Sequence, residues 1–294
     1  MNMTEKERIN ADQIKEAVAA VKRLRPAYKE MLDFYEKLFL AQEAAKEKIH
    51  IDPISISDDL LSMKRQEKFP LVNRADLVID MKASESLLRE ICRLAAGATQ
   101  ALAEAGSKIL DALDSKRLDP QVLFSKTSAE DDTYFEKLAK DLEIDKKLLA
   151  FVAYSSIKPS LSLSAEQLAS YLDNDAQWGK GYCPVCGSPP ALSILRDEGQ
   201  RSLLCSFCGH EWPIQRIYCP FCENMDQKSL HYFYSEEEDN YRVNVCDKCK
   251  KYIKTVDTRE MKYPVYLFLE QISTLHLDML AKDQGLESGI SLWL

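Results

Sequence analysis

The spacing of apolar residues gives the first half of the chain a helical period. Up to about residue 175, apolar residues recur at intervals of three and four positions, with Asp, Ser or Pro near the start of each run. The helical runs cover residues 9–24, 26–49, 84–113 and 131–157. Prolines and turn residues in two breaks, around residues 50–59 and 68–78, interrupt this pattern. We therefore expect a multihelical bundle rather than one long coiled coil.

The second half follows a different pattern, in which short apolar segments alternate with turns. Residues 191–196 and 201–205 flank the turn Asp-Glu-Gly-Gln, and each of the two segments is short enough for a strand. Residues 229–234 and 241–246 flank the acidic stretch Ser-Glu-Glu-Glu-Asp-Asn, which we interpret as a solvated turn. The pattern therefore predicts two hairpins.

Cysteine pairs coincide with both hairpins. Of nine cysteines, eight form four C-x-x-C pairs, and such a pair alone is found in redox sites, disulfides and metal sites alike. Four pairs in a short window favour tetrathiolate sites, in which two pairs supply the sulfur ligands of one metal ion. The expected ligands are Cys183, Cys186, Cys205 and Cys208 for one ion, and Cys219, Cys222, Cys246 and Cys249 for the other.

The spacing of the pairs supports this assignment. Between Cys186 and Cys205 lie 18 residues, and between Cys222 and Cys246 lie 23, which a longer hairpin accommodates. Sequential pairing closes the smallest loops, and an interleaved pairing is the structural alternative. A disulfide framework is disfavoured because nothing marks the chain as secreted. Sulfur ligands suit iron and zinc equally, so we expect two ions per chain, either Fe or Zn.

The residue after each second cysteine predicts a difference between the two sites. Gly187 and Gly209 fill this position in the first site, where a positive φ lets backbone N–H groups point at the sulfurs. Glu223 and Lys250 stand there in the second site. We therefore expect a different turn geometry or looser hydrogen bonding in the second site.

These patterns together predict an α+β fold. A multihelical N-terminal bundle, residues 1–177, precedes two tandem zinc-ribbon-like β modules, residues 178–218 and 219–260. A strand at 251–258 ends the second module. The C-terminal segment, residues 261–294, contains a helix at residues 264–285 that we expect to pack on the helical bundle.

Composition and charge limit the classes of function. The chain of 294 residues is 46% hydrophobic, enough for a substantial core. Its first residues lack the apolar segment of an export signal, and no apolar run reaches the ~18 residues needed to span a bilayer. We therefore expect a cytoplasmic protein with no membrane insertion. Residues 178–258 contain 10 Lys and Arg against 11 Asp and Glu, a net charge of −1, which disfavours nucleic-acid binding.

Other reactive side chains have simpler interpretations. Cys92 lies within an apolar helical pattern and is expected to be a buried core thiol. His50 and His276 are expected to be structural or exposed, and His210 follows a site that four cysteines already complete. The chain has no phosphate-binding glycine loop, nucleophile elbow or His-Glu-x-x-His motif. The sequence therefore predicts a protein that is not an enzyme.

Several motifs around the cysteines extend the pattern. They are GYCPVCGSPP, EGQRSLLCSFCGHEW, the Trp212-x-x-x-Arg216-x-x-Cys219 link, LHYFYSEEE, CDKCKKYIK, and a final helix with Leu277-Asp278 followed by Gly285. This set, over residues 178 to 285, resembles the FdhE family, accessory proteins for formate dehydrogenase maturation. Members of that family tend to carry an acidic pair before the last helix, where this chain has only Glu270.

The resemblance implies a cytoplasmic, non-enzymatic assembly factor. Such a protein would bind the catalytic subunit of a formate dehydrogenase during its maturation, with rubredoxin-like knuckles that the family associates with iron. Arg216, Tyr252 and Lys254 are the candidate contact residues for that partner, on the expectation that they are exposed around the linked ribbons. For Arg216, a structural role in bridging the two sites is the alternative. The oligomeric state is open, and a homo-oligomer is one alternative.

Two other classes of protein fit parts of the pattern. The first is a rubredoxin-like electron carrier or redox protein, which would need iron at a usable potential and a partner reductase. The second is a zinc-ribbon nucleic-acid-binding protein, against which the charge balance argues. Colour separates the carrier from a zinc protein, because a ferric tetrathiolate absorbs visible light and a zinc site does not.

Overall fold

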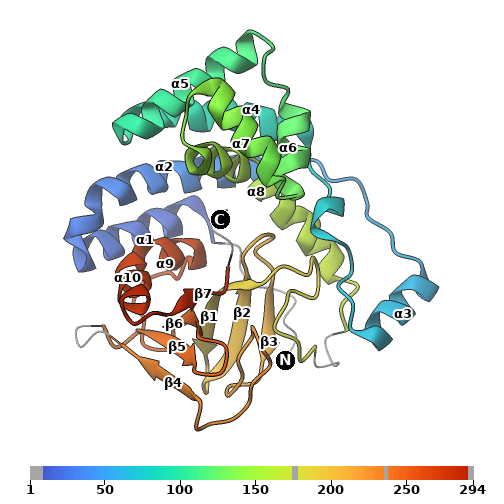
Figure 1. The fold of residues 1–294 in the computed structure, drawn as a ribbon, viewed down its shortest axis with the longest axis vertical. Coiled ribbons are helices and arrows are strands. Elements are labelled where there is room, and N and C mark those ends of the chain that lie inside the picture. The colour runs from blue at the N-terminus through green and yellow to red at the C-terminus, as the bar shows by residue number, and fades with distance from the viewer. Residues whose placement is uncertain (1–8, 174–177, 235–237, 291–294) are drawn as a thin grey trace. The chain divides into compact units, whose positions relative to one another are not determined.

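The computed structural model describes residues 9–173, 178–234 and 238–290 of the chain (Figure 1). The residues divide into two compact units, each built from separate stretches of the chain. The first, which we call the ribbon unit, comprises the described parts of Met1–Val21, Ser55–Asn73 and Leu168–Ser291. The second, which we call the helical unit, comprises Lys22–Ile54 and Arg74–Gln167.

The helical unit contains most of the amphipathic helices that the sequence predicts. Its helices are α2 (Lys29–Lys46), α4 (Met81–Leu94), α5 (Gln100–Asp114), α6 (Pro120–Ser128), α7 (Asp132–Leu142) and most of α8 (Lys146–Ala169). Helix α4 packs on α2, α5 and α6. Fully buried Leu88, Ile91 and Ile109 contribute to the core of this unit. The apolar spacing therefore identified the buried faces of these helices correctly.

Some helix ends differ from the prediction. The run 84–113 is two helices, because a short 3-10 helix at Ala95–Gly97 ends α4 and Thr99 accepts a hydrogen bond from the N–H of Leu102 to begin α5. Asp80, Asp119 and Asp131 begin α4, α6 and α7 in the same way. Helices α3 (Asp58–Glu67) and α6 were not predicted, because each is short and has little apolar periodicity.

The ribbon unit is built on one seven-stranded sheet. Its strands are β1 (Pro190–Arg196), β2 (Gln200–Cys205), β3 (Glu211–Ile214), β4 (Leu230–Phe233), β5 (Tyr241–Cys246), β6 (Lys251–Asp257) and β7 (Glu287–Ser288). The order is β3-β2-β1-β6-β5-β4, with β7 pairing with β6. Both predicted hairpins and the strand after the last cysteine pair are present. Strand β3 was not predicted, because its Pro213 is unfavourable inside a strand and is tolerated here at the sheet edge.

The two ribbons join through a parallel pair of strands. Module one contributes β1, β2 and β3, module two contributes β4, β5 and β6, and β1 pairs with β6 in parallel, with Ser193 opposite Thr255. All other pairs within the two modules are antiparallel. The modules expected at 178–218 and 219–260 are therefore halves of one continuous sheet.

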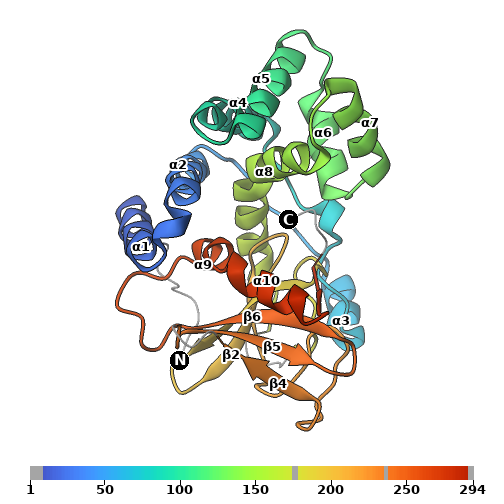
Figure 2. The same ribbon diagram turned by 60° about the vertical axis from the view of Figure 1, so that its left-hand side comes forward.

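The C-terminal helix packs on this sheet. The predicted helix at 264–285 is two helices, α9 (Leu267–Ser273) and α10 (Leu275–Asp283), with a break at Thr274. Figure 2 shows α10 running across β5 and β6. Leu277 and Ala281 of α10 are fully buried against the sheet. These apolar side chains fill the sheet face of the ribbon unit, and the expected packing of the segment on the helical bundle stays a prediction.

The compact units also differ from the predicted domain boundaries. Residues 55–73, expected within the helical domain, group with the ribbons. The N–H groups of Leu71 and Val72 donate to the carbonyl oxygens of Pro184 and Val185, at 2.9 and 3.0 Å. These bonds attach a distant segment to the first cysteine pair. Whether each unit folds on its own stays a prediction.

Candidate metal centres

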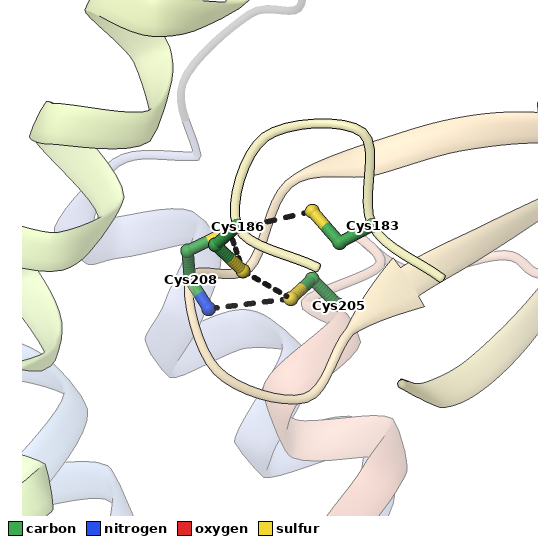
Figure 3. A group of neighbouring side chains, drawn as sticks. All are labelled: Cys183, Cys186, Cys205 and Cys208. Carbon is green, nitrogen blue, oxygen red and sulfur yellow. Dashed lines mark hydrogen bonds between the residues drawn. The ribbon is translucent and has the colours of Figure 1, made fainter. Parts of the chain in front are cut away.

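The first group of four cysteines forms where two turns face each other. Cys183 and Cys186 lie in the turn before β1, whereas Cys205 ends β2 and Cys208 lies in the turn after it (Figure 3). The sulfur of Cys186 lies 3.5 Å from the sulfurs of Cys205 and Cys208, and the sulfurs of Cys183 and Cys208 are 3.7 Å apart. All four residues are buried. We call this group cluster 1.

The second group repeats this arrangement in the other half of the sheet. Cys219 and Cys222 precede β4, whereas Cys246 ends β5 and Cys249 lies in the turn before β6. The sulfurs of Cys219 and Cys249 are 3.7 Å apart, and those of Cys222 and Cys246 are 3.6 Å apart. We call this group cluster 2. The sequential pairing expected from the sequence is the one that the structure shows, and the interleaved pairing is not formed.

The geometry of both clusters suits a tetrahedral metal ion. Four sulfurs at about 2.3 Å from a central ion lie about 3.8 Å from one another. The observed sulfur separations of 3.5 to 3.7 Å are close to that value. The two clusters could therefore each hold one ion. Four sulfur ligands do not choose between iron and zinc.

The ionisation of the thiols also favours a bound cation. Burial raises the pKa of Cys183 and of Cys208 well above the usual range, whereas hydrogen bonds from neighbouring thiols lower the pKa of Cys186. Four thiolates this close repel one another, so a cation is needed before all can ionise. In cluster 2, burial raises the pKa of Cys246, but hydrogen bonds from Asn224 and from backbone N–H groups outweigh it and bring it to about 7.

Backbone N–H groups point at the sulfurs in both clusters. The N–H groups of Phe207 and Cys208 lie 3.4 Å from the sulfur of Cys205. In cluster 2, the N–H groups of Phe221 and Cys222 lower the pKa of Cys219 against the larger, opposite effect of its burial. Such hydrogen bonds orient metal ligands and stabilise the thiolate form. Both clusters therefore have the backbone support of a metal knuckle.

The turns after the second cysteines are alike, contrary to expectation. Gly187 and Gly209 have φ of 75° and 74°, and Glu223 and Lys250 both have φ of 59°. The N–H groups of Gly187, Glu223 and Lys250 each donate to the carbonyl of the first cysteine of their pair, at 2.8 to 2.9 Å. The predicted difference in turn geometry is wrong, because the knuckle imposes a left-handed residue even where it is not glycine.

The two clusters differ in what covers them. Cluster 1 is backed by the chain segment before residue 73, where Pro70 lies 3.2 Å from the position of a Cβ on Gly187. The hydroxyl of Tyr182 donates to the carbonyl of Lys68 at 2.7 Å. In cluster 2, by contrast, Cys222 and Cys249 are partly exposed.

Polar side chains take the place of this cover in cluster 2. The amide of Asn224 donates to the sulfur of Cys246 at 3.5 Å and to the hydroxyl of Ser229 at 2.8 Å. Asn224 itself is buried, and its backbone carbonyl accepts a hydrogen bond from the N–H of Cys219 at 2.8 Å. The sequence analysis did not identify Asn224. Its position directly after the left-handed residue of a knuckle was the available signal.

Two of the three candidate partner-binding residues are buried. Tyr252 is 8% exposed and Lys254 is 6% exposed. The ammonium of Lys254 lies 2.6 Å from a carboxylate oxygen of Asp278, and the hydroxyl of Tyr252 donates to the same carboxylate at 2.9 Å. The expectation that both side chains are exposed is wrong, because they attach α10 to β6. Arg216 is exposed, as expected.

The remaining candidates have the structural roles that the sequence suggests. Cys92 is 2% exposed, and burial raises its pKa to about 12. The Nε2 of His276 lies 2.8 Å from a carboxylate oxygen of Glu238, and the side chain of His50 is 82% exposed. The backbone carbonyl of His210 accepts a hydrogen bond from the N–H of Cys205 at 2.8 Å. Of the acidic turn, residues 235–237 lie outside the described part of the chain.

Glu270, which stands where the family tends to carry an acidic pair, is also buried. Its carboxylate accepts a hydrogen bond from the hydroxyl of Tyr241 at 2.5 Å, and Tyr241 lies within 3.0 Å of the hydroxyl of Tyr263. The carboxylate therefore connects α9 to β5. Within the described ranges, no helix is long and apolar enough to cross a membrane.

Comparisons with known proteins agree with this architecture. Residues 182–216 match the family description "FdhE, central domain". A protein FdhE homolog of Aquifex aeolicus is 38% identical over 146 residues, which cover 48% of this chain and 50% of that protein. Protein FdhE of Escherichia coli O127:H6 is 31% identical over 134 residues, which cover 43% of this chain and 42% of the relative. The chain thus spans about half the length of the curated relatives it matches.

A solved structure extends the likeness to nearly the whole fold. The crystal structure of the FdhE protein from Pseudomonas aeruginosa superposes with a TM-score of 0.67 and 21% identity, and covers 97% of this chain and 96% of that one. At this identity the superposition speaks for the fold alone. The fold class predicted from the sequence is confirmed. The chain has a helical N-terminal region, a sheet, two cysteine clusters and C-terminal helices. The chain is therefore similar to FdhE proteins in sequence over about half of its length and in fold over nearly all of it.

Proposed function

We propose that this chain is an accessory protein that binds the catalytic subunit of a formate dehydrogenase during its maturation, and that it is not itself an enzyme. The family resemblance supplies the identity of the partner. The observation that carries a binding role is a set of four exposed apolar side chains along the link and the second ribbon, Ile217, Met225, Tyr232 and Tyr234, which we call the apolar surface. Ile217 and Tyr232 line the same pocket, and the rings of Tyr232 and Tyr234 are neighbours.

This surface has the features of a protein contact. The four side chains are 43% to 58% exposed, and the rings of Tyr232 and Tyr234 lie 6.3 Å apart. Aromatic residues and methionine are enriched in protein interfaces, where they bury large areas at low entropic cost. The surface lies on a sheet that two metal centres would make rigid. A rigid apolar surface suits a protein that holds another chain.

A capture experiment tests the proposed partner. The tagged full-length chain, expressed in its own cells, should recover the catalytic subunit of a formate dehydrogenase, identified by mass spectrometry. Replacing Met225 and Tyr234 with serine should reduce recovery at least tenfold. Met279→Ser is the matched control, because Met279 is 66% exposed but lies on α10. Recovery of no formate dehydrogenase subunit by the unaltered chain would contradict the proposal.

Loss of the gene tests the role in maturation. A deletion strain should lose formate dehydrogenase activity while the catalytic subunit is still synthesised, and the purified chain alone should not oxidise formate. Re-introduction of the unaltered gene should restore activity, and re-introduction of the Met225 and Tyr234 double variant should not. Normal activity in the deletion strain would argue against the assignment.

One observation favours electron transfer as a second function. Cys222 and Cys249 of cluster 2 are partly exposed, so iron held there would lie near the protein surface. Visible absorption of the protein as isolated separates the two functions, because zinc gives none. A reversible one-electron titration of the coloured protein would support the carrier function, and a colourless protein would exclude it.

A further inference from the structure

A pocket opens in the ribbon unit beside cluster 2. It has a volume of about 280 Å³ and lies over β4, β5 and the link between the two ribbons. The backbone or side chains of Cys219 and Cys246 form part of its wall, whereas Cys222 and Cys249 do not. The pocket therefore adjoins the metal cluster without being the space between the four sulfurs. It is smaller than a drug-sized site, and its size suits a small ligand.

Positive charge dominates the wall of this pocket. Arg201, Arg216, Arg242 and Lys251 line it, and no Asp or Glu is among the described residues that do. This concentration is unusual for a chain with a net charge of −8. The basic residues come from β2, the link, β5 and β6, so the fold gathers them from separate places in the sequence. A cluster of cations without acids attracts an anion.

Arg201 holds the wall of the pocket in place. Its Nε donates to the hydroxyl of Ser193 at 2.8 Å, and its Nη1 donates to the carbonyls of Tyr218 and Arg216 at 2.7 and 3.2 Å. Burial lowers the pKa of Arg201 to about 10, and the charge of Arg242 lowers it further, so Arg201 remains charged at neutral pH. Its bond to the carbonyl of Tyr218, the residue before Cys219, places Arg201 beside cluster 2.

Arg242 makes fewer hydrogen bonds than Arg201 does. Its Nε is buried and has no hydrogen-bond partner within the described residues, and its guanidinium lies 4.8 Å from the centre of the Tyr232 ring. Burial lowers the pKa of Arg242, Tyr232 and Asp257 act in the opposite direction, and the charges of Arg216 and Arg259 lower it by less. Asp257 is itself bound by Arg259, and Arg242 forms no ion pair with a carboxylate of the described residues. The charge of Arg242 is therefore only partly compensated.

The metal cluster does not account for all of this positive charge. A divalent ion with four thiolates would carry a charge of −2, and Arg201, bonded to the backbone next to Cys219, is the basic residue beside it. Arg216, Arg242 and Lys251 remain. Lys251 lies 5.8 Å from the ring centre of Phe221, and Arg216 is exposed at the pocket rim. Basic side chains with aromatic faces beside them suit a phosphate joined to a planar or apolar group.

We propose that this pocket binds a small phosphate-bearing ligand, with Arg216, Arg242 and Lys251 holding the phosphate. Arginine presents a planar fork of N–H donors that matches two phosphate oxygens, and Lys251 adds a point charge. The rings of Tyr232 and Phe221 form the apolar part of the site. The pocket shares Ile217 and Tyr232 with the apolar surface, but the inference does not rest on the proposed formate dehydrogenase partner, since it concerns a small molecule that is tested on the purified chain.

Calorimetric titration of the full-length, metal-loaded chain tests this site. The probes are inorganic pyrophosphate and AMP, at low ionic strength, and both should bind at one site per chain. Tighter binding of AMP would show that the ring contributes, and equal binding would assign the affinity to phosphate alone. Arg242→Gln and Arg216→Gln should each weaken binding about tenfold, as expected for loss of a charged hydrogen bond.

The control variants distinguish binding in the pocket from long-range electrostatic attraction. Arg259→Gln removes the same charge outside the pocket, where Arg259 pairs with Asp257, and should change the affinity less than about twofold. Arg242→Lys keeps the charge but loses the fork, and should bind with intermediate affinity. Metal content and melting temperature of each variant establish that it is folded. If Arg216→Gln, which alters an exposed side chain, leaves binding unchanged, the site is refuted.

Two further outcomes would overturn the proposal. The first is that neither pyrophosphate nor AMP binds the unaltered chain. The second is that an acidic peptide or a single-stranded oligonucleotide binds more tightly than both probes and is displaced by neither. Equal weakening by Arg259→Gln and Arg242→Gln would likewise assign the binding to long-range charge and not to the pocket.

Discussion

Cluster 1 lies inside the ribbon unit, whereas cluster 2 reaches its surface. The cysteine pattern, the left-handed turns and the sulfur separations are the same in both. The difference lies in the neighbours. Cluster 1 has the segment ending at Asn73 bonded to its first knuckle, and cluster 2 has Asn224, Ser229 and an open pocket. The comparison shows that the same ligand motif supports a sealed centre and an accessible one, and that residues outside the motif decide which.

Chelation should show the largest difference between the clusters. Structural tetrathiolate sites contribute on the order of 10 kcal/mol to folding, so removing both ions should unfold the ribbon unit while the helical unit keeps its own core. The ion of cluster 2 should leave first, because two of its cysteines are partly exposed. Metal release and hydrogen exchange over residues 183–249 measure both steps. Unchanged exchange after complete chelation would show that the sites are not structural.

Gly209→Ala should have the next largest effect, in cluster 1. A Cβ on Gly209 would lie 2.9 Å from the ring of Phe268, and the residue has a φ of 74° that an alanine adopts at a cost. We expect a loss of about 2 kcal/mol in the free energy of unfolding of the ribbon unit, measured by denaturant titration of Trp212 fluorescence. Gly285→Ala is the control, since its φ is also positive but nothing lies within 4 Å of its Cβ position. Equal losses would attribute the effect to the backbone alone.

Lys254→Met should weaken the attachment of α10 to the second ribbon. The variant removes the ammonium that bonds Asp278 and the carbonyl of Gln271, and leaves a partly buried carboxylate without its cation. Such a loss costs about 1–3 kcal/mol. Lys228→Met, which alters an exposed lysine, should change the free energy of unfolding of the ribbon unit by less than about 0.5 kcal/mol. A stable Lys254→Met protein with reduced partner capture would restore the contact role first expected for this residue.

Lys250→Gly should give the smallest effect, with the opposite sign. Lys250 holds a φ of 59°, which glycine adopts without steric cost, although glycine also gains entropy in the unfolded chain. We expect the ribbon unit to gain up to about 1 kcal/mol, measured in the same denaturation experiment. The exposed bond from its side chain to Asp247 spans 3.4 Å and contributes little. A destabilised variant would show that the lysine side chain has a function in the knuckle.

The sequence predicted which cysteines form each cluster, but it did not predict which residues surround the clusters. The C-x-x-C spacing identified all eight cysteines and their sequential pairing, because the ligand chemistry is local to each knuckle. The left-handed residues at Glu223 and Lys250 were missed because only glycine signals a positive φ in a sequence. Tyr252 and Lys254 were expected at the surface because Asp278, which binds both, lies more than 20 residues further along the chain.

The basic pocket could not be predicted from the sequence either, because its residues are far apart in the chain. Arg201, Arg216 and Arg242 lie on different elements. The sequence does not reveal their grouping, because the positive and negative charges of residues 178–258 nearly cancel. Only strand pairing brings them together. The fold class was predictable because periodicity is a local property, whereas the packing of α10 on the sheet depends on Leu277 and Ala281 meeting a surface formed by both ribbons.

The parallel joint between β1 and β6 sets an order of events during protein synthesis. Ser193 pairs with Thr255, so the sheet cannot close until the ribosome has released the chain beyond the last cysteine pair. The β1–β2 hairpin and cluster 1 need only residues up to 208, together with the segment before residue 73 that has already emerged. The first ribbon can therefore acquire its ion while the second ribbon is still being translated. The unpaired edge of β1 is then available for pairing with β6.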